Sequence, residues 1–142
     1  MKRTLKLTTT ILLVLATLLF CVACNTVDAT GVWENATYRR DVSFGNGQKT
    51  VTVIVEAGEQ SVTFTVKTDK STLADALTEH GIISGEETEY GLSVYTVNGM
   101  TANWNTDGAY WALYEGKDYA MTGVSFIEIK DGASYRFVYS GV

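Results

Sequence analysis

The chain has 142 residues, a formal net charge of −5 and a single histidine, and neither of its two cysteines lies beyond Cys24. An acidic chain is poorly suited to binding nucleic acid, so we expect no nucleic-acid partner. Most hydrolytic mechanisms need a nucleophile and a base that activates it. A chain with one histidine and no cysteine after Cys24 lacks most such pairs, so we expect no enzyme.

The N-terminal segment has the pattern of a secretion signal. Three basic residues (Lys2, Arg3 and Lys6) precede a stretch from Ile11 to Ala23 that has no charge and no glycine. Such a stretch suits a signal peptide and is too short to cross a hydrocarbon core of about 30 Å comfortably. We therefore expect residues 1–23 to be a signal peptide.

The segment Cys21-Val22-Ala23-Cys24 resembles a bacterial lipobox, in which small residues precede the cysteine that receives the lipid. Cys24 is the predicted lipidation site, because Phe20 is too large to precede a cut before Cys21. Acyl chains contribute about 0.8 kcal/mol per buried CH₂, and more than one chain gives stable anchoring. This predicts a domain anchored by lipid on the extracellular face of the cell membrane. A plain signal peptide cut near Ala23 and an uncleaved anchor remain alternatives.

Removal of residues 1–23 takes away three basic and no acidic residues, so the mature charge is 8 − 16 = −8. Residues 24–48 have weak periodicity and several polar residues and glycines. We interpret them as a flexible tether that can end in a short strand. The folded domain is then expected to span residues 49–142, about the length of one domain.

The first half of this domain predicts a hairpin followed by a helix. Residues 50–56 and 61–67 alternate between apolar and polar side chains on either side of a short glycine turn. Residues 71–81 carry Leu73, Ala76, Leu77 and His80 on one face at helical spacing. Ser71 or Thr72 can cap the start of this helix, and Gly81 can close its end. His80 is expected to be structural.

The second half predicts several strands. An acidic loop with Glu86, Glu87 and Glu89 leads to strands at 92–97, 109–114, 126–129 and 134–139. A hairpin, a helix and then further strands are typical of an α+β fold. We expect a β-grasp-like mixed sheet with one crossing helix.

Residues 90–139 resemble a known family. They carry Tyr90-Gly91-Leu92, Val97-Asn98-Gly99, Tyr110-Trp111-Ala112-Leu113-Tyr114, Gly123-Val124, Lys130-Asp131-Gly132 and Tyr135-Arg136-Phe137-Val138-Tyr139. This series is similar to a bacterial family of unknown function whose domain is like the C-terminal β-grasp domain of transcobalamin and intrinsic factor. The resemblance extends over roughly residues 49–140. It departs from the family pattern in two turns, at Ala133 and at Glu115-Gly116.

The resemblance implies a ligand-binding domain, with cobalamin as the family's best-known ligand. In the vitamin carriers an α-helical domain supplies the other half of the site. The predicted ligand-binding residues are those of the aromatic cluster and its neighbouring turn: Trp104, Tyr110, Tyr114, Tyr119 and Asn98. Trp111 is expected in the core, because one face of its strand must be buried. Trp104 lies in a polar loop, where it either stacks on a ligand or covers the end of the sheet.

The sequence thus predicts a cell-surface lipoprotein that captures a small ligand, such as cobalamin or a similar corrinoid, for a membrane transporter. No resident cofactor or metal is expected. An adhesion or scaffolding module for a protein or glycan is one alternative. A cation-binding domain that uses Glu86, Glu87, Glu89, Asp107 and Asp118 is another, although their spacing matches no EF-hand.

Overall fold

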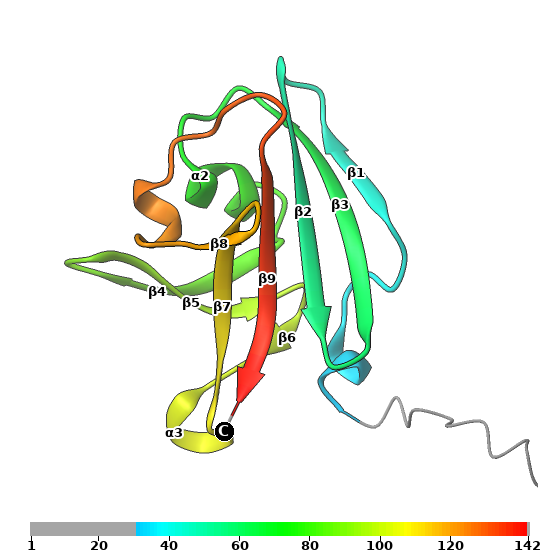
Figure 1. Ribbon diagram of the computed structural model, residues 1–142, viewed down its shortest axis with the longest axis vertical. Helices are drawn as coiled ribbons and strands as arrows, with labels where there is room; N and C mark the ends of the chain where they lie inside the picture. The colour runs from blue at the N-terminus through cyan, green and yellow to red at the C-terminus, as the bar shows by residue number, and fades with distance from the viewer. Residues whose placement is uncertain (1–30, 142) are drawn as a thin grey trace, which may run out of the picture. The chain divides into compact units, whose positions relative to one another are not determined.

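Two β-sheets and short helices make up the part of the chain that the computed structural model describes, residues 31–141. The larger sheet has six strands in the order β1-β3-β2-β9-β7-β8, and the smaller has three in the order β4-β5-β6 (Figure 1). The bounds are η1 Val32–Asn35, β1 Val42–Gly45, β2 Lys49–Ala57, β3 Gln60–Thr68, α2 Leu73–Thr78, β4 Ile83–Thr88, β5 Gly91–Val97, β6 Met100–Thr101, α3 Trp104–Asp107, β7 Ala109–Glu115, β8 Asp118–Tyr119, η2 Val124–Phe126 and β9 Ser134–Gly141. The predicted α+β fold with a mixed sheet and a crossing helix is confirmed. The predicted signal peptide and Cys24 lie outside the described residues.

The folded unit begins at Val32, which is earlier than the predicted boundary at residue 49. Trp33 is only 6% exposed, and its indole Nε1–H donates to the carbonyl of Ala57 over 2.7 Å. Strand β1 pairs with β3 in parallel, in the register Val42 to Phe64. Residues 32–48 therefore belong to the domain, so the predicted boundary at residue 49 lies too far along the chain, and the short strand expected at the end of the tether is β1. The earlier start was not predicted because a single buried tryptophan gives no periodic pattern.

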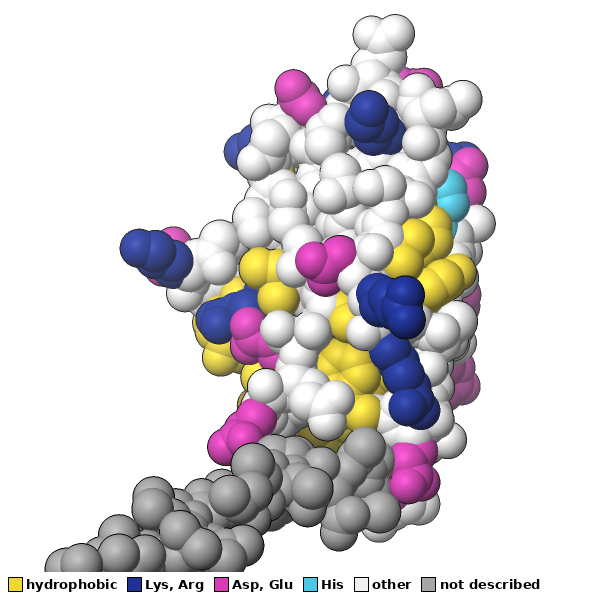
Figure 2. Space-filling model, turned by 90° about the vertical axis from the view of Figure 1, so that its right-hand side faces the viewer, with side chains coloured by type: hydrophobic (Ala, Val, Ile, Leu, Met, Phe, Trp, Pro, Cys, Tyr) yellow, Lys and Arg dark blue, Asp and Glu magenta, His cyan; other side chains and the backbone are white. Residues whose placement is uncertain are grey.

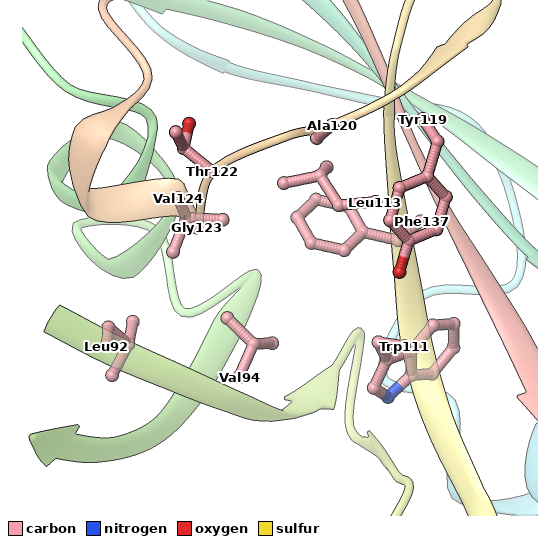
Figure 3. Close-up of a pocket in the computed structure, with 10 residues that line it drawn as sticks. All are labelled: Leu92, Val94, Trp111, Leu113, Tyr119, Ala120, Thr122, Gly123, Val124 and Phe137. Atoms are coloured by element: carbon pink, nitrogen blue, oxygen red, sulfur yellow. The ribbon is translucent and has the colours of Figure 1, made fainter. Parts of the chain in front are cut away.

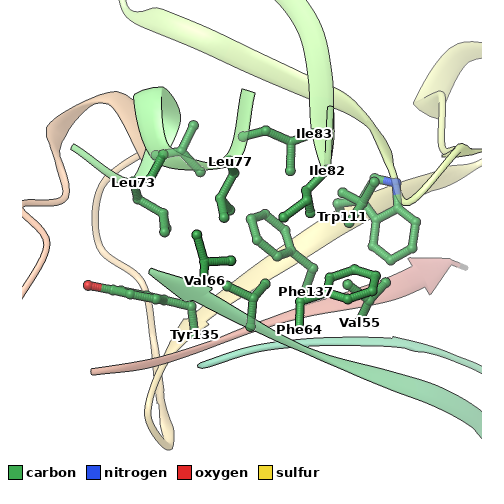
Figure 4. Packing of buried hydrophobic residues seen from close by; sticks show 14 of the residues in the cluster. Val55, Phe64, Val66, Leu73, Leu77, Ile82, Ile83, Trp111, Tyr135 and Phe137 are labelled. Carbon is green, nitrogen blue, oxygen red and sulfur yellow. The ribbon is translucent and has the colours of Figure 1, made fainter. Parts of the chain in front are cut away.

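Strands β2 and β3 form the predicted hairpin and supply one side of the core. Val51, Val53 and Val55 of β2 are at most 1% exposed, and so are Phe64 and Val66 of β3. The alternation expected from the sequence places these side chains on one face of the sheet. Figure 4 shows Val66 of this hairpin facing Leu73 and Leu77 of α2, so the helix buries its apolar face against the hairpin.

Strand β9 lies in the middle of the larger sheet. It pairs with β2 in parallel, with Val53 opposite Tyr135, and with β7 in antiparallel, with Trp111 opposite Tyr139. The last strand thus joins the hairpin to β7 and β8 (Figure 1). Without it the six-stranded sheet would be two separate pieces.

Helix α2 has the predicted caps. The hydroxyl of Thr72 accepts a hydrogen bond from the N–H of Asp75 over 3.2 Å, so Thr72 rather than Ser71 is the N-cap. Gly81 takes a positive φ of 65°, as expected for a residue that closes a helix. Within residues 31–141, no helix is both long and apolar enough to span a bilayer.

The acidic segment is a strand rather than the predicted loop. Glu86 and Glu87 lie in β4, which pairs with β5 and has an irregular register between Ser84 and Gly85. Only Ile83 of this strand is buried, so its sequence lacks the apolar alternation by which strands are predicted. The backbone of Gly85 approaches that of Ser93 so closely that a Cβ would collide with it.

Residues 126–129 do not form the predicted sheet strand. The chain makes a 3₁₀ turn, η2, and Phe126 is 64% exposed. Ile127 and Ile129 are buried, but their main chains bond to Leu73 and Ser71 beside α2. The predicted alternation of buried residues is present, but the segment bonds to the start of α2 and the residues before it and not to a sheet.

Candidate ligand-binding site

Strand β7 carries most of the predicted aromatic residues on its two faces. Tyr110 and Tyr114 share one face, which we call the outer face because it points away from the core. Trp111 points inward and is 8% exposed, and its Nε1–H donates to the carbonyl of Met100 over 3.2 Å. The prediction that Trp111 is a core residue is confirmed.

The other predicted aromatic residues fall into two separate pairs. Trp104 of α3 meets Tyr110 edge-on, with 6.2 Å between ring centroids. Tyr119 of β8 meets Tyr114 edge-on at 5.4 Å. Tyr110 and Tyr114 are four residues apart on one strand, a distance of about 13 Å. The structure therefore does not bring the predicted residues together into one site.

Asn98 is a structural residue rather than a ligand contact. It is 1% exposed, its Oδ1 accepts from the N–H of Tyr38, and its Nδ2 donates to the carbonyl of Tyr38, both over 2.8 Å. Its own N–H and carbonyl bond to Ile82 and Thr37. With each of these polar groups already bonded inside the protein, Asn98 has none to offer a ligand, and its inclusion in the predicted site is wrong.

A pocket of about 200 Å³ opens between the two sheets, and we call it the inter-sheet pocket. In Figure 3, Leu92 and Val94 of β5 face Trp111 and Leu113 of β7 across this space. The segment from Tyr119 to Val124 and the ring of Phe137 complete the wall. The lining is mostly aliphatic and aromatic, with the hydroxyl of Thr122 at one side.

A second and larger hollow of about 520 Å³ adjoins the same segment, and we call it the loop groove. Its lining is mixed, with apolar, hydroxyl and charged side chains: Glu115, Gly116, Thr122, Phe126, Ile127, Glu128, Lys130, Ala133, Ser134 and Tyr135. Thr122 lines both hollows, so residues 119–126 separate them. The chain thus forms two neighbouring hollows on either side of this segment.

Large apolar side chains stand exposed around these hollows. Tyr119 is 54% exposed, Met121 91% and Phe126 64%. Tyr90 is also exposed, and its neighbour Gly91 lies so close to Ser125 that a Cβ there would stand only 2.8 Å from the serine side chain. Met121 and Phe126 were not among the predicted ligand-binding residues, because Met121 lies in a segment without periodicity and Phe126 was assigned to a strand.

Charges and phenols border the C-terminal end of β7. The guanidinium of Arg136 lies 4.5 Å from the ring centroid of Tyr114 and 3.6 Å from the carboxylate of Glu56. In the loop groove, burial and then the nearby Glu115 carboxylate raise the pKa of Tyr135 above its ordinary value. Tyr135 is therefore a neutral hydroxyl at physiological pH, able to donate or accept a hydrogen bond.

His80 lies away from both hollows. It stacks on Phe44 of β1, with 5.3 Å between ring centroids, and its Nε2 is 3.9 Å from the carboxylate of Glu79. As the only histidine, it is the cyan side chain beside a hydrophobic group in Figure 2. This position agrees with the structural role expected for it.

The acidic residues considered for a cation are spread over separate elements. Glu86 and Glu87 lie in β4, Asp107 in α3 and Asp118 in β8. Among residues 31–141, no three His, Cys, Asp or Glu side chains are grouped so that they could hold a metal ion.

Comparison with known proteins identifies the fold. No family model and no curated protein matches the sequence. A crystal structure of a Ruminococcus gnavus protein, described only provisionally as metal-binding, is 27% identical and has a TM-score of 0.63; the match covers 67% of this chain and 99% of that one. Haptocorrin in complex with Cbi is 20% identical with a TM-score of 0.55, over 69% of this chain.

The fold is therefore similar to that of a transcobalamin-type C-terminal domain, as the sequence resemblance implied. The match covers 26% of the haptocorrin chain, so this chain spans about a quarter of that protein. At this identity the likeness to haptocorrin concerns the fold alone.

Proposed function

We propose that this chain is a cell-surface lipoprotein whose domain binds a corrinoid-like small ligand across the inter-sheet pocket and the loop groove. The observation that carries the proposal is the pair of adjoining hollows, bordered by exposed apolar side chains, in a domain with this fold. Haptocorrin, which shares the fold, was crystallised in complex with Cbi.

The sizes of the hollows indicate how a ligand would lie. Binding sites that enclose a small molecule usually measure about 300–1,000 Å³, and the inter-sheet pocket is smaller at 200 Å³. It can take one edge or substituent of a large ligand. The loop groove, at 520 Å³, can take another part. A ligand as broad as a corrinoid would span both and remain partly open to water.

The linings fit a ligand with an apolar body and polar edges. Tyr119, Met121 and Phe126 expose apolar surface that a flat ring system would cover, with a gain of about 25 cal/mol per Å². The hydroxyls of Thr122, Ser134 and Tyr135 border the hollows and can bond to amide substituents. Apolar contact would then provide affinity, and the hydroxyls would orient the ligand.

Lipid attachment at Cys24 would hold this domain at the extracellular face of the cell membrane, where a transporter could receive its ligand. We expect cells that express the full-length precursor and are grown with labelled palmitate to incorporate the label into this protein. Cys24→Ala should abolish the label, whereas Cys21→Ala should keep it, because only Cys24 follows two small residues. Label that persists in Cys24→Ala would contradict the anchor.

Titration of the mature chain with cobinamide and with cobalamin tests the ligand. Since Trp111 lines the inter-sheet pocket, bound ligand should quench its fluorescence and raise the melting temperature. Tyr119→Ala combined with Phe126→Ala should weaken binding about tenfold or more, the equivalent of about 1.4 kcal/mol.

Tyr110→Ala is the matched control, because it removes an exposed tyrosine of β7 that lies about 13 Å from Tyr114, the residue that Tyr119 contacts. It should leave corrinoid affinity unchanged. Absence of any spectral or thermal change at about 1 mM of both corrinoids would overturn the proposal, since that limit corresponds to only about −4 kcal/mol.

A further inference from the structure

Trp104 is an exposed tryptophan on a fixed piece of backbone. Its side chain is 56% exposed. The Oδ1 of Asn103 caps α3 by accepting from the N–H of Asn105 over 2.9 Å, and the carboxylate of Asp107 accepts from the N–H of Asn103 over 3.1 Å. Gly108 ends the turn with a φ of 61°, and its N–H bonds to the carbonyl of Trp104. The backbone that carries the indole is thus fixed by a closed set of local bonds.

The ring of Tyr110 lies beside the indole of Trp104. The two rings are 6.2 Å apart at 63°, so they form an apolar corner, and Tyr110 is 43% exposed. Such a corner offers one ring face and one ring edge to the same bound group. The pair lies about 13 Å along β7 from Tyr114 and the loop groove, and is therefore a separate site.

Polar residues neighbour Trp104 along the chain and Tyr110 across the sheet. Asn105, Thr106 and Asp107 are exposed beside Trp104, and Ser140 lies opposite Tyr110 across the β7–β9 pair. Within the described residues, the side chains of Asn105 and Thr106 make no hydrogen bond. The carboxylate of Asp107 is close enough to Tyr139 to raise the pKa of that phenol, second in effect to burial. Amide, hydroxyl and carboxylate groups therefore lie in the same turn as Trp104.

We propose that this corner, which we call the Trp104 platform, binds a neutral hexopyranose unit of a glycan. A pyranose ring presents a flat face of C–H groups, which packs on an aromatic ring, and a belt of hydroxyls at its edge. The face would lie on Trp104 against Tyr110, and the hydroxyls would bond to Asn105, Thr106 and Asp107. Small-ligand sites commonly combine aromatic walls with a few polar groups that fix orientation.

Charge and area select this ligand over other candidates. The mature chain carries a net charge of −8, and Asp107 lies at the platform itself, so anionic polysaccharides are disfavoured. Stable protein interfaces bury about 800 Å² on each partner. Two aromatic side chains among polar neighbours offer much less apolar area than the core of such an interface needs. One sugar ring matches the size of the corner.

The test titrates the mature chain with cellotetraose, mannotetraose and chitotetraose and follows tryptophan fluorescence and calorimetric heat. We expect at least one of these neutral glycans to bind with a dissociation constant at or below about 1 mM and to shift the Trp104 emission to shorter wavelength. Trp104→Ala and Tyr110→Ala should each weaken binding about tenfold or more. Trp104→Phe should retain part of the affinity, because it keeps an aromatic face.

Tyr119→Ala is the matched control and should leave glycan affinity unchanged, the reverse of its expected effect on corrinoid binding. Urea unfolding of Trp104→Ala should resemble that of the parent, since the indole is more than half exposed. Failure of all three glycans to bind at about 10 mM, or binding that survives Trp104→Ala in a folded protein, would overturn the proposal. Neither result would bear on the corrinoid site.

Discussion

Trp33→Ala is expected to lower the free energy of unfolding by about 3–5 kcal/mol, as removal of a buried aromatic ring usually does. The substitution empties the space of a side chain that is 6% exposed and deletes the hydrogen bond to the carbonyl of Ala57. Urea unfolding of the mature chain, followed by circular dichroism, measures the loss.

Trp33→Phe provides the control for the hydrogen bond. It keeps an aromatic ring in the core and removes the indole N–H, so its cost should be about 1–2 kcal/mol. A loss below about 1 kcal/mol in Trp33→Ala would mean that residues 32–48 contribute little to the cooperative unit. They would then behave as the tether that the sequence suggested, in contradiction to the structure.

Asn98→Ala is expected to cost about 2–4 kcal/mol. The substitution leaves the N–H and the carbonyl of Tyr38 without the two partners that Asn98 supplies over 2.8 Å. A main-chain group left unbonded at a buried position costs about 1–3 kcal/mol. Asn98 also has a φ of 52°, a left-handed conformation that alanine tolerates poorly. The melting temperature and the urea midpoint should both fall.

Asn98→Gly separates these two causes. Glycine adopts a positive φ without strain but lacks the amide, so it should lose the hydrogen bonds alone. We expect it to be less destabilised than Asn98→Ala by about 1 kcal/mol. Equal stability of Asn98→Gly and the parent would show that the bonds to Tyr38 contribute nothing. It would also reopen a role for the Asn98 side chain outside the core.

The parts of the fold that sequence predicted well are those in which burial imposes a period. β2 and β3 alternate because one face of each is fully buried, and α2 repeats at helical spacing because it covers them. β4 escaped prediction because nearly all of it is exposed, and β1 was expected only as an unplaced short strand because it has four residues and pairs in parallel with β3. Neither leaves a local signal.

The site was predicted in composition but not in arrangement. The aromatic cluster was found, yet its division into two pairs depends on β7 running about 13 Å between Tyr110 and Tyr114. Proximity in the chain could not show that. Asn98 was misassigned because the same Asn-Gly pair serves in exposed turns and in buried ones. Its burial against Tyr38 arises from a segment 60 residues earlier.

The central place of β9 has a consequence for when the protein can fold during its synthesis. Residues 134–141 must pair with β2 on one side and β7 on the other before the six-stranded sheet exists. Contacts between such distant segments form slowly, because the entropy lost in closing the long loop between them opposes pairing. A ribosome that has not yet released residues 134–141 therefore holds a chain that cannot complete its sheet. Under the export that we propose, an unfolded chain is the form that can pass through a narrow channel, so this strand order would keep the sheet incomplete until residues 134–141 have been made.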